Sequence, residues 1–116
     1  MPREFVILSA APVTAVEVVT AAATVDGSLG AGRLWQGGGV QVATDDSLVL
    51  AVLRSTQLED PQEARRSLGL PVAAPTPAAV WWTEAYGPFD GPLTATLARR
   101  LADDVQGTLV TTGDDR

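Results

Sequence analysis

Cysteine and histidine are both absent from the 116 residues of this chain. Their absence excludes disulfide bonds, thiol nucleophiles and zinc sites built from the usual nitrogen and sulfur ligands. It also removes the side chain that most often transfers protons near neutral pH. We therefore predict no metal and no other cofactor, and a binding protein is expected rather than an enzyme.

Lysine is missing as well, so all 8 basic residues are arginines, which face 14 acidic residues and leave a net charge of −6. Together with abundant alanine, valine and glycine, this composition is typical of a GC-rich genome and indicates a bacterial source. An acidic chain repels phosphate backbones, so nucleic acid is not an expected partner. A basic partner protein is compatible with the charge.

Long apolar runs are also lacking. The first residues lead directly into a short apolar segment, without the charged start, apolar stretch and cleavage site of a signal peptide. No run approaches the roughly 18 apolar residues of a membrane span. We expect a cytoplasmic protein that does not contact membranes. With 46% hydrophobic and 19% charged residues, the chain is expected to fold as a single domain over residues 1–116.

Short runs rich in β-branched and aromatic residues predict the strands. Residues 40–44 and 48–53 form the clearest hairpin, because a polar Asp-Asp-Ser turn separates them. The second of these strands is apolar throughout whereas the first alternates, so the second is expected to be more buried. Three further strands are expected at residues 4–8, 79–86 and 108–112.

One helix has a clear apolar stripe. Its four large apolar side chains recur at four-residue steps, which predicts an amphipathic helix with one face on the core. These side chains are Leu93, Leu97, Leu101 and Val105. Asp90 is expected to cap the helix, within a turn at residues 87–92.

The other helices are less distinct. A helix is predicted over residues 13–25, but its many valines and threonines also allow a strand at residues 13–20. A short third helix is predicted at residues 60–68, because Asp60, Pro61 and Glu63 form a capping pattern. Residues 27–32 and the proline-rich residues 70–78 are expected to be connections.

The order of these elements is β-α-β-β-(short α)-β-α-β. It predicts the α+β class, with an antiparallel or mixed sheet and two main helices on one face. The closest common template is the ferredoxin-like fold, with its split β-α-β arrangement. Such a fold hosts many unrelated functions, so no function follows from it.

Trp81 and Trp82 are the main candidates for a binding surface. Neighbouring residues of a strand point to opposite faces, so these two rings cannot share one core. If helices cover one face, the other face holds an indole that is available for contact, as aromatic anchors at interfaces are. In the alternative, the helix at residues 93–105 covers one ring and a connection or a second subunit covers the other.

Glu84 and Tyr86 share a strand face with Trp82. Their aromatic surroundings could desolvate the Glu84 carboxylate and favour its protonated form, which makes Glu84 and Tyr86 the one plausible acid–base pair. An exposed or satisfied glutamate is the better expectation, since most strand carboxylates are structural or solvated.

Two further aromatic residues complete the predicted binding residues. Phe89 follows the tryptophan strand and is expected either to staple the next helix or to be an exposed contact. Trp35 precedes three glycines at positions 37–39, which favour a sharp turn or bulge over a nucleotide-binding loop. The predicted binding set is Trp35, Trp81, Trp82, Glu84, Tyr86 and Phe89.

Three functions fit these residues. The first is a non-enzymatic domain that recognises a protein partner, or itself in a homodimer, through the aromatic sheet face. The second is a regulatory domain that binds a small ligand between sheet and helices near Trp35, Trp82 and Tyr86. The third is a small enzyme or enzyme subunit that uses Glu84, Tyr86 and an arginine such as Arg33 or Arg54.

Overall fold

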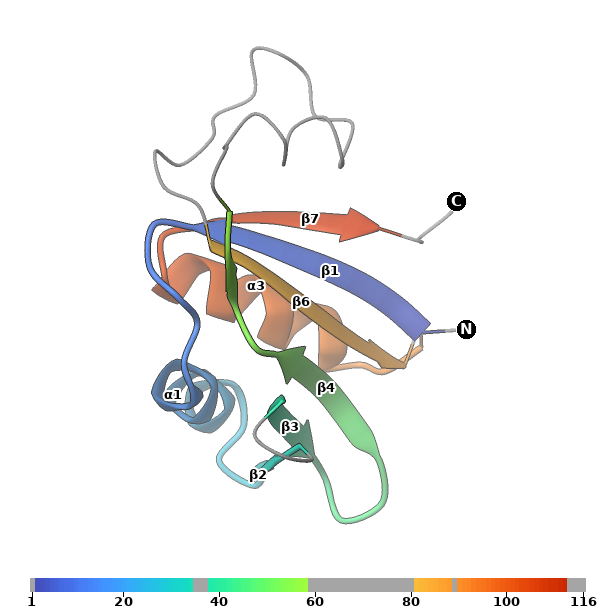
Figure 1. Cartoon of the computed structure of the whole chain (residues 1–116). Helices are drawn as coiled ribbons and strands as arrows, with labels where there is room; N and C mark the ends of the chain where they lie inside the picture. The colour runs from blue at the N-terminus through green and yellow to red at the C-terminus, as the bar shows by residue number, and fades with distance from the viewer. Residues whose placement is uncertain (1, 35–37, 59–80, 89, 113–116) are drawn as a thin grey trace.

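A computed structural model describes residues 2–34, 38–58, 81–88 and 90–112 of the chain. These residues form a seven-stranded sheet, in which every described strand pair is antiparallel, and two helices (Figure 1). The predicted α+β class is confirmed, and the sheet is antiparallel rather than mixed. The elements are β1 (Pro2–Ser9), α1 (Ala15–Val25), β2 (Gly30–Arg33), β3 (Gly39–Ala43), β4 (Leu48–Leu53), β5 (Thr56–Gln57), β6 (Trp81–Pro88), α3 (Thr94–Asp104) and β7 (Thr108–Thr112).

The strands lie in the order β2-β3-β4-β6-β1-β7, and β5 pairs with the beginning of β6. Strands β1 and β4 are both antiparallel to β6, which lies between them, so they run in the same direction. Strands β6 and β7 are both antiparallel to β1, which lies between them, so they also run in the same direction. Each pair of parallel strands is therefore split by a third strand, and the connection within each pair contains one helix.

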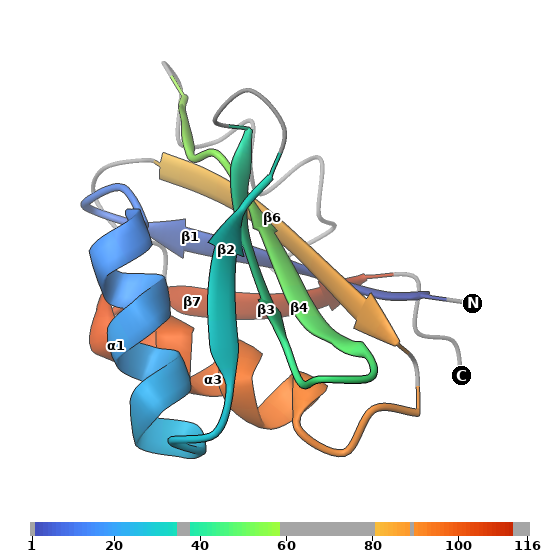
Figure 2. The same ribbon diagram turned by 90° about the horizontal axis from the view of Figure 1, so that it is seen from below.

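Both helices cover the same face of the sheet (Figure 2). Helix α1 contacts α3, β2 and β3, whereas α3 packs against β1, β4, β6 and β7. Strand β1 separates two apolar clusters: Phe5 and Ile7 belong to the core under the helices, while Val6 and Leu8 form a cluster on the opposite face. We call these two sides of the sheet the helix face and the open face.

The apolar stripe of α3 lies where the sequence predicted. Leu97 and Leu101 are fully buried, together with Ala98 and Ala102 beside them, and Leu93 and Val105 pack at the margin. The beginning of α3 differs from the prediction, because Leu93 is the N-cap residue and no side chain caps the helix.

The helix predicted over residues 13–25 is confirmed as α1, and the alternative strand is wrong. The Glu17 carboxylate accepts hydrogen bonds from the Thr14 backbone N–H, at 2.7 Å, and from the Thr14 hydroxyl, which favours a helix start here. These bonds lower the pKa of Glu17, the Thr14 hydroxyl having the largest effect. The valines are divided between core and solvent: Val18 is buried, whereas Val16 and Val19 are 70% and 50% exposed.

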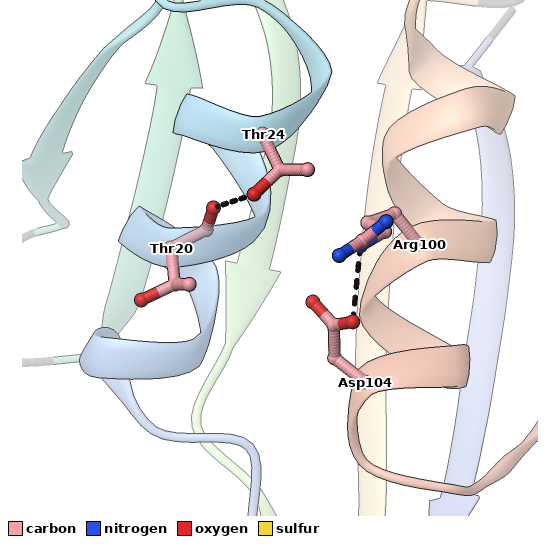
Figure 3. A network of polar contacts seen from close by, with 4 residues as sticks. All are labelled: Thr20, Thr24, Arg100 and Asp104. Carbon is pink, nitrogen blue, oxygen red and sulfur yellow. Dashed lines mark hydrogen bonds and ion pairs between the residues drawn. The ribbon is translucent and has the colours of Figure 1, made fainter.

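Polar contacts lie on the sides of the two helices that face each other (Figure 3). In α1 the Thr24 hydroxyl donates to the Thr20 carbonyl at 2.9 Å. In α3 Arg100 Nε lies 3.0 Å from Asp104 Oδ1, one helical turn further along. Both contacts are local to one helix, so they support the helices individually rather than their packing on the sheet.

The hairpin predicted at residues 40–44 and 48–53 is confirmed as β3 and β4. Strand β3 alternates, with Gln41 exposed and Val42 buried, while β4 is buried from Val49 to Val52. The pairing shifts between Val42 and Ala43, which indicates a bulge.

Other boundaries differ from the predictions. The expected connection at residues 27–32 is wrong in its second half, because Gly30–Arg33 pairs with β3 as strand β2. Strand β6 runs to Pro88 and takes up the beginning of the turn predicted at residues 87–92. The predicted short helix at residues 60–68 and the proline-rich connection at residues 70–78 lie outside the described residues.

Candidate functional site

Strand β6 directs its two tryptophans to opposite faces, as the sequence predicted. Trp82 packs against the open-face cluster of Val6 and Leu8. Ala85 belongs to the helix-face core, and Trp81 lies on the same side of β6 because an even number of residue steps separates the two. Both indoles are half-buried. Trp81 and Trp82 therefore belong to two separate surfaces rather than to one site.

The open face brings Trp82, Glu84 and Tyr86 together along one strand. Across the sheet, Tyr86 pairs with Glu4 of β1 on one side and with Ala51 of β4 on the other. Tyr86 is 38% exposed, and the side chains of Glu84 and Glu4 are exposed too. Ala51 is buried, whereas the exposed Glu4 places a carboxylate beside the Tyr86 ring.

A hydrogen bond joins two of these residues. Trp82 Nε1 donates to Glu84 Oε2 at 3.1 Å, which holds the indole and the carboxylate in a fixed relation. The Glu84 side chain is exposed, so the preferred expectation of an exposed glutamate is confirmed.

A pocket of about 520 Å³ lies on the helix face, where the beginning of α1 meets the end of β4. We call it the Trp81 pocket. Its described lining combines apolar walls with two arginines and a few hydroxyls. The lining residues are Pro12, Val13, Thr14, Ala15, Val18, Arg33, Gly39, Val40, Val52, Leu53, Arg54, Ser55 and Trp81.

An irregularity between β4 and β5 shapes this pocket. Val52 pairs with Ala85 of β6, and Thr56 pairs with Trp82 of β6. Four residue steps on the β4–β5 side therefore match three steps on β6, so the β4–β5 side contains one extra residue. Ser55, within this segment, accepts a hydrogen bond from the Val13 N–H at 2.9 Å. Its hydroxyl also lies 2.6 Å from the buried Thr83 hydroxyl. These contacts attach the segment before α1 to the sheet.

The predicted ligand pocket between sheet and helices was assigned to the wrong tryptophan. Trp82 and Tyr86 lie on the open face, so they cannot line a pocket under the helices. Trp81 takes that position. The same pocket is lined by Arg33 and Arg54, which the sequence analysis gave as possible functional arginines. Trp35, the glycine at position 37 and Phe89 lie outside the described residues.

No protein-family model, curated protein or solved structure shows significant similarity to this chain. Within the described ranges, neither helix is long and apolar enough to cross a membrane. The same residues contain no group of three acidic side chains close enough to hold a metal ion. The cytoplasmic location expected from the sequence stays a prediction.

Proposed function

We propose that this chain is a non-enzymatic binding domain that recognises a protein partner, or a second copy of itself, through the open face. The observation that carries the proposal is the exposed Tyr86, which lies on the same strand face as Trp82 and Glu84, a face that neither described helix covers. Tyrosine and tryptophan are the side chains that most often dominate binding energy at interfaces, because they combine a large apolar area with a polar edge.

The charges around Tyr86 define the kind of partner. Glu4 lies directly across the ladder from Tyr86, and Glu84 lies two residues before it on the same face. A partner surface with an arginine or lysine beside an apolar anchor would complement this arrangement, because the cation could pair with a carboxylate and lie over the Tyr86 ring. The net charge of −6 favours the same class of partner.

We also propose that the fold is ferredoxin-like. Strands β7, β1, β6 and β4, with α1 and α3, have the order that the ferredoxin-like template requires, and β2 and β3 extend the sheet beyond β4. In that arrangement the helices occupy one face, and Glu4, Glu84 and Tyr86 are exposed on the other. The fold itself carries no function, so the argument depends on the residues of the open face.

Replacing Tyr86 by alanine is expected to weaken partner binding by tenfold or more, roughly the effect of losing an interface hot spot. The matched control is Val16→Ala, which removes an exposed apolar side chain from α1 on the other face. Binding of a different protein is measured by partner capture from the native lysate with equal amounts of each tagged variant. Sedimentation velocity measures self-association.

Both variants must keep the thermal unfolding midpoint of the wild-type protein for the comparison to count.

Reversing the charge in Glu4→Arg is expected to weaken the same interaction, since a basic partner would then meet a like charge. Unchanged capture and unchanged self-association in Tyr86→Ala would refute the assignment of the open face. Equal losses in Tyr86→Ala and Val16→Ala would do the same.

A further inference from the structure

We propose that the Trp81 pocket binds a small aryl anion, a ligand with a flat apolar body and one carboxylate or phosphate group. This site lies on the helix face and is independent of the open face. The proposal rests on three features of the pocket: its apolar walls, the arginines in its lining and the hydrogen bonds that fix Ser55 beside it.

The walls fit the apolar body of such a ligand. Trp81 supplies an indole, and Val18 from α1 and Val52 from β4 supply branched side chains. Binding sites for small molecules are concave and mostly apolar, with volumes of about 300–1,000 Å³. The 520 Å³ of this pocket lies within that range. An aromatic ring can stack on the indole with less lost rotamer entropy than a flexible chain.

The charge of the described lining is opposite to that of the whole chain. Arg33 and Arg54 line the pocket, and no carboxylate is among its described lining residues, although acidic residues outnumber basic ones by 14 to 8. A guanidinium group matches the geometry of a carboxylate or phosphate with two parallel N–H donors.

The position of Arg33 follows from the sheet. Arg33 pairs with Val40 across the β2–β3 ladder, and Val40 packs against the helix-face core, so both side chains are on the pocket side. The beginning of α1 contributes less, because the Glu17 carboxylate already accepts the Thr14 N–H. Arg33, rather than the helix end, therefore defines where the anion would lie.

Two part-buried polar contacts hold Ser55, which lines the pocket, in place. Ser55 joins the Val13 N–H to the Thr83 hydroxyl, which is fully buried. These contacts link the segment before α1, the β4–β5 irregularity and β6, which are the three parts of the chain around Trp81. A site that is already formed before the ligand arrives needs less free energy to order its side chains on binding, which favours tighter binding.

The test uses 8-anilinonaphthalene-1-sulfonate, a fluorescent aryl anion, and N-phenyl-1-naphthylamine, which has the same rings without the charge. We expect the wild-type protein to bind the anion more tightly than the neutral amine. Arg33→Gln is expected to weaken binding of the anion about three- to tenfold and to leave the amine unchanged. The control Arg99→Gln makes the same change in net charge on an exposed position of α3, and binding is expected to stay within twofold of wild type.

A second variant tests the location without touching an arginine. Ala15 lines the pocket at the exposed first turn of α1, so Ala15→Phe should fill the entrance and weaken both probes while the thermal midpoint is kept. Competition with benzoate and with phenyl phosphate distinguishes a carboxylate from a phosphate ligand. The proposal is overturned if wild-type protein does not bind the anion, if Arg33→Gln and Arg99→Gln have equal effects, if Ala15→Phe binds like wild type, or if inorganic phosphate competes as well as phenyl phosphate.

Discussion

Replacing Leu101 by alanine is expected to lower the free energy of unfolding by about 2–5 kcal/mol. Leu101 is fully buried on α3 and belongs to the core between the helices and the sheet. The substitution removes apolar contacts and leaves a cavity that the surrounding strands can close only in part. For a domain of this size, whose total stability is expected to be about 5–15 kcal/mol, such a loss is large. Urea denaturation followed by circular dichroism measures it.

Val16→Ala provides the comparison for the core prediction. Val16 is 70% exposed on α1, so its truncation should change the free energy of unfolding by less than roughly 0.5 kcal/mol. Alanine also has the better helix propensity, so a small gain in stability is compatible with the structure. Equal losses in the two variants would mean that α3 does not pack on the sheet in the way described.

Gly87→Ala is the second substitution with a large expected effect. A Cβ atom at Gly87 would lie 2.4 Å from the Val49 carbonyl oxygen and 2.7 Å from Thr94 Cγ2. The Thr94 hydroxyl donates to that same carbonyl at 2.8 Å, and this bond joins the first residue of α3 to β4. The added methyl group must displace the helix or open the ladder, and we expect a loss of roughly 1–3 kcal/mol or more.

Gly32→Ala is the matched control for this clash. No atom lies within 4 Å of a Cβ built at Gly32, which is exposed in β2. Alanine restricts the unfolded chain without a cost in the folded one, so stability should stay constant or rise by up to about 1 kcal/mol. Thermal unfolding of both variants under the same conditions measures the difference. A destabilised Gly32→Ala beside an unaffected Gly87→Ala would contradict the described contact between α3 and the sheet.

The parts of the fold that the sequence predicts are those in which side-chain pattern and packing agree. The stripe of α3 and the alternation in β3 match the period of their elements, and both are confirmed. Strand β2 has no such pattern, because Gly-Ala-Gly-Arg contains no β-former. It becomes a strand through its ladder with β3, and a local sequence cannot show that pairing.

The same limit applies to the candidate sites. A period of two in an extended segment predicts that Trp81 and Trp82 diverge, and they do. It does not reveal which ring faces the helices, because that depends on which side of the sheet α1 and α3 cover. The Trp81 pocket combines segments around Val13, Arg33, Arg54 and Trp81. Such segments meet only through the strand order, so no local motif could have located the pocket.

The assignment of neighbouring indoles to separate surfaces is tested most directly by fluorine NMR of protein labelled with 5-fluorotryptophan. Trp81→Phe and Trp82→Phe assign two of the three tryptophan signals, and the labelled wild-type protein is titrated with 8-anilinonaphthalene-1-sulfonate. We expect the Trp81 signal to shift with ligand concentration while the Trp82 signal stays in place. Equal shifts of both signals, or a shift of Trp82 alone, would contradict the division of β6 between the open face and the pocket.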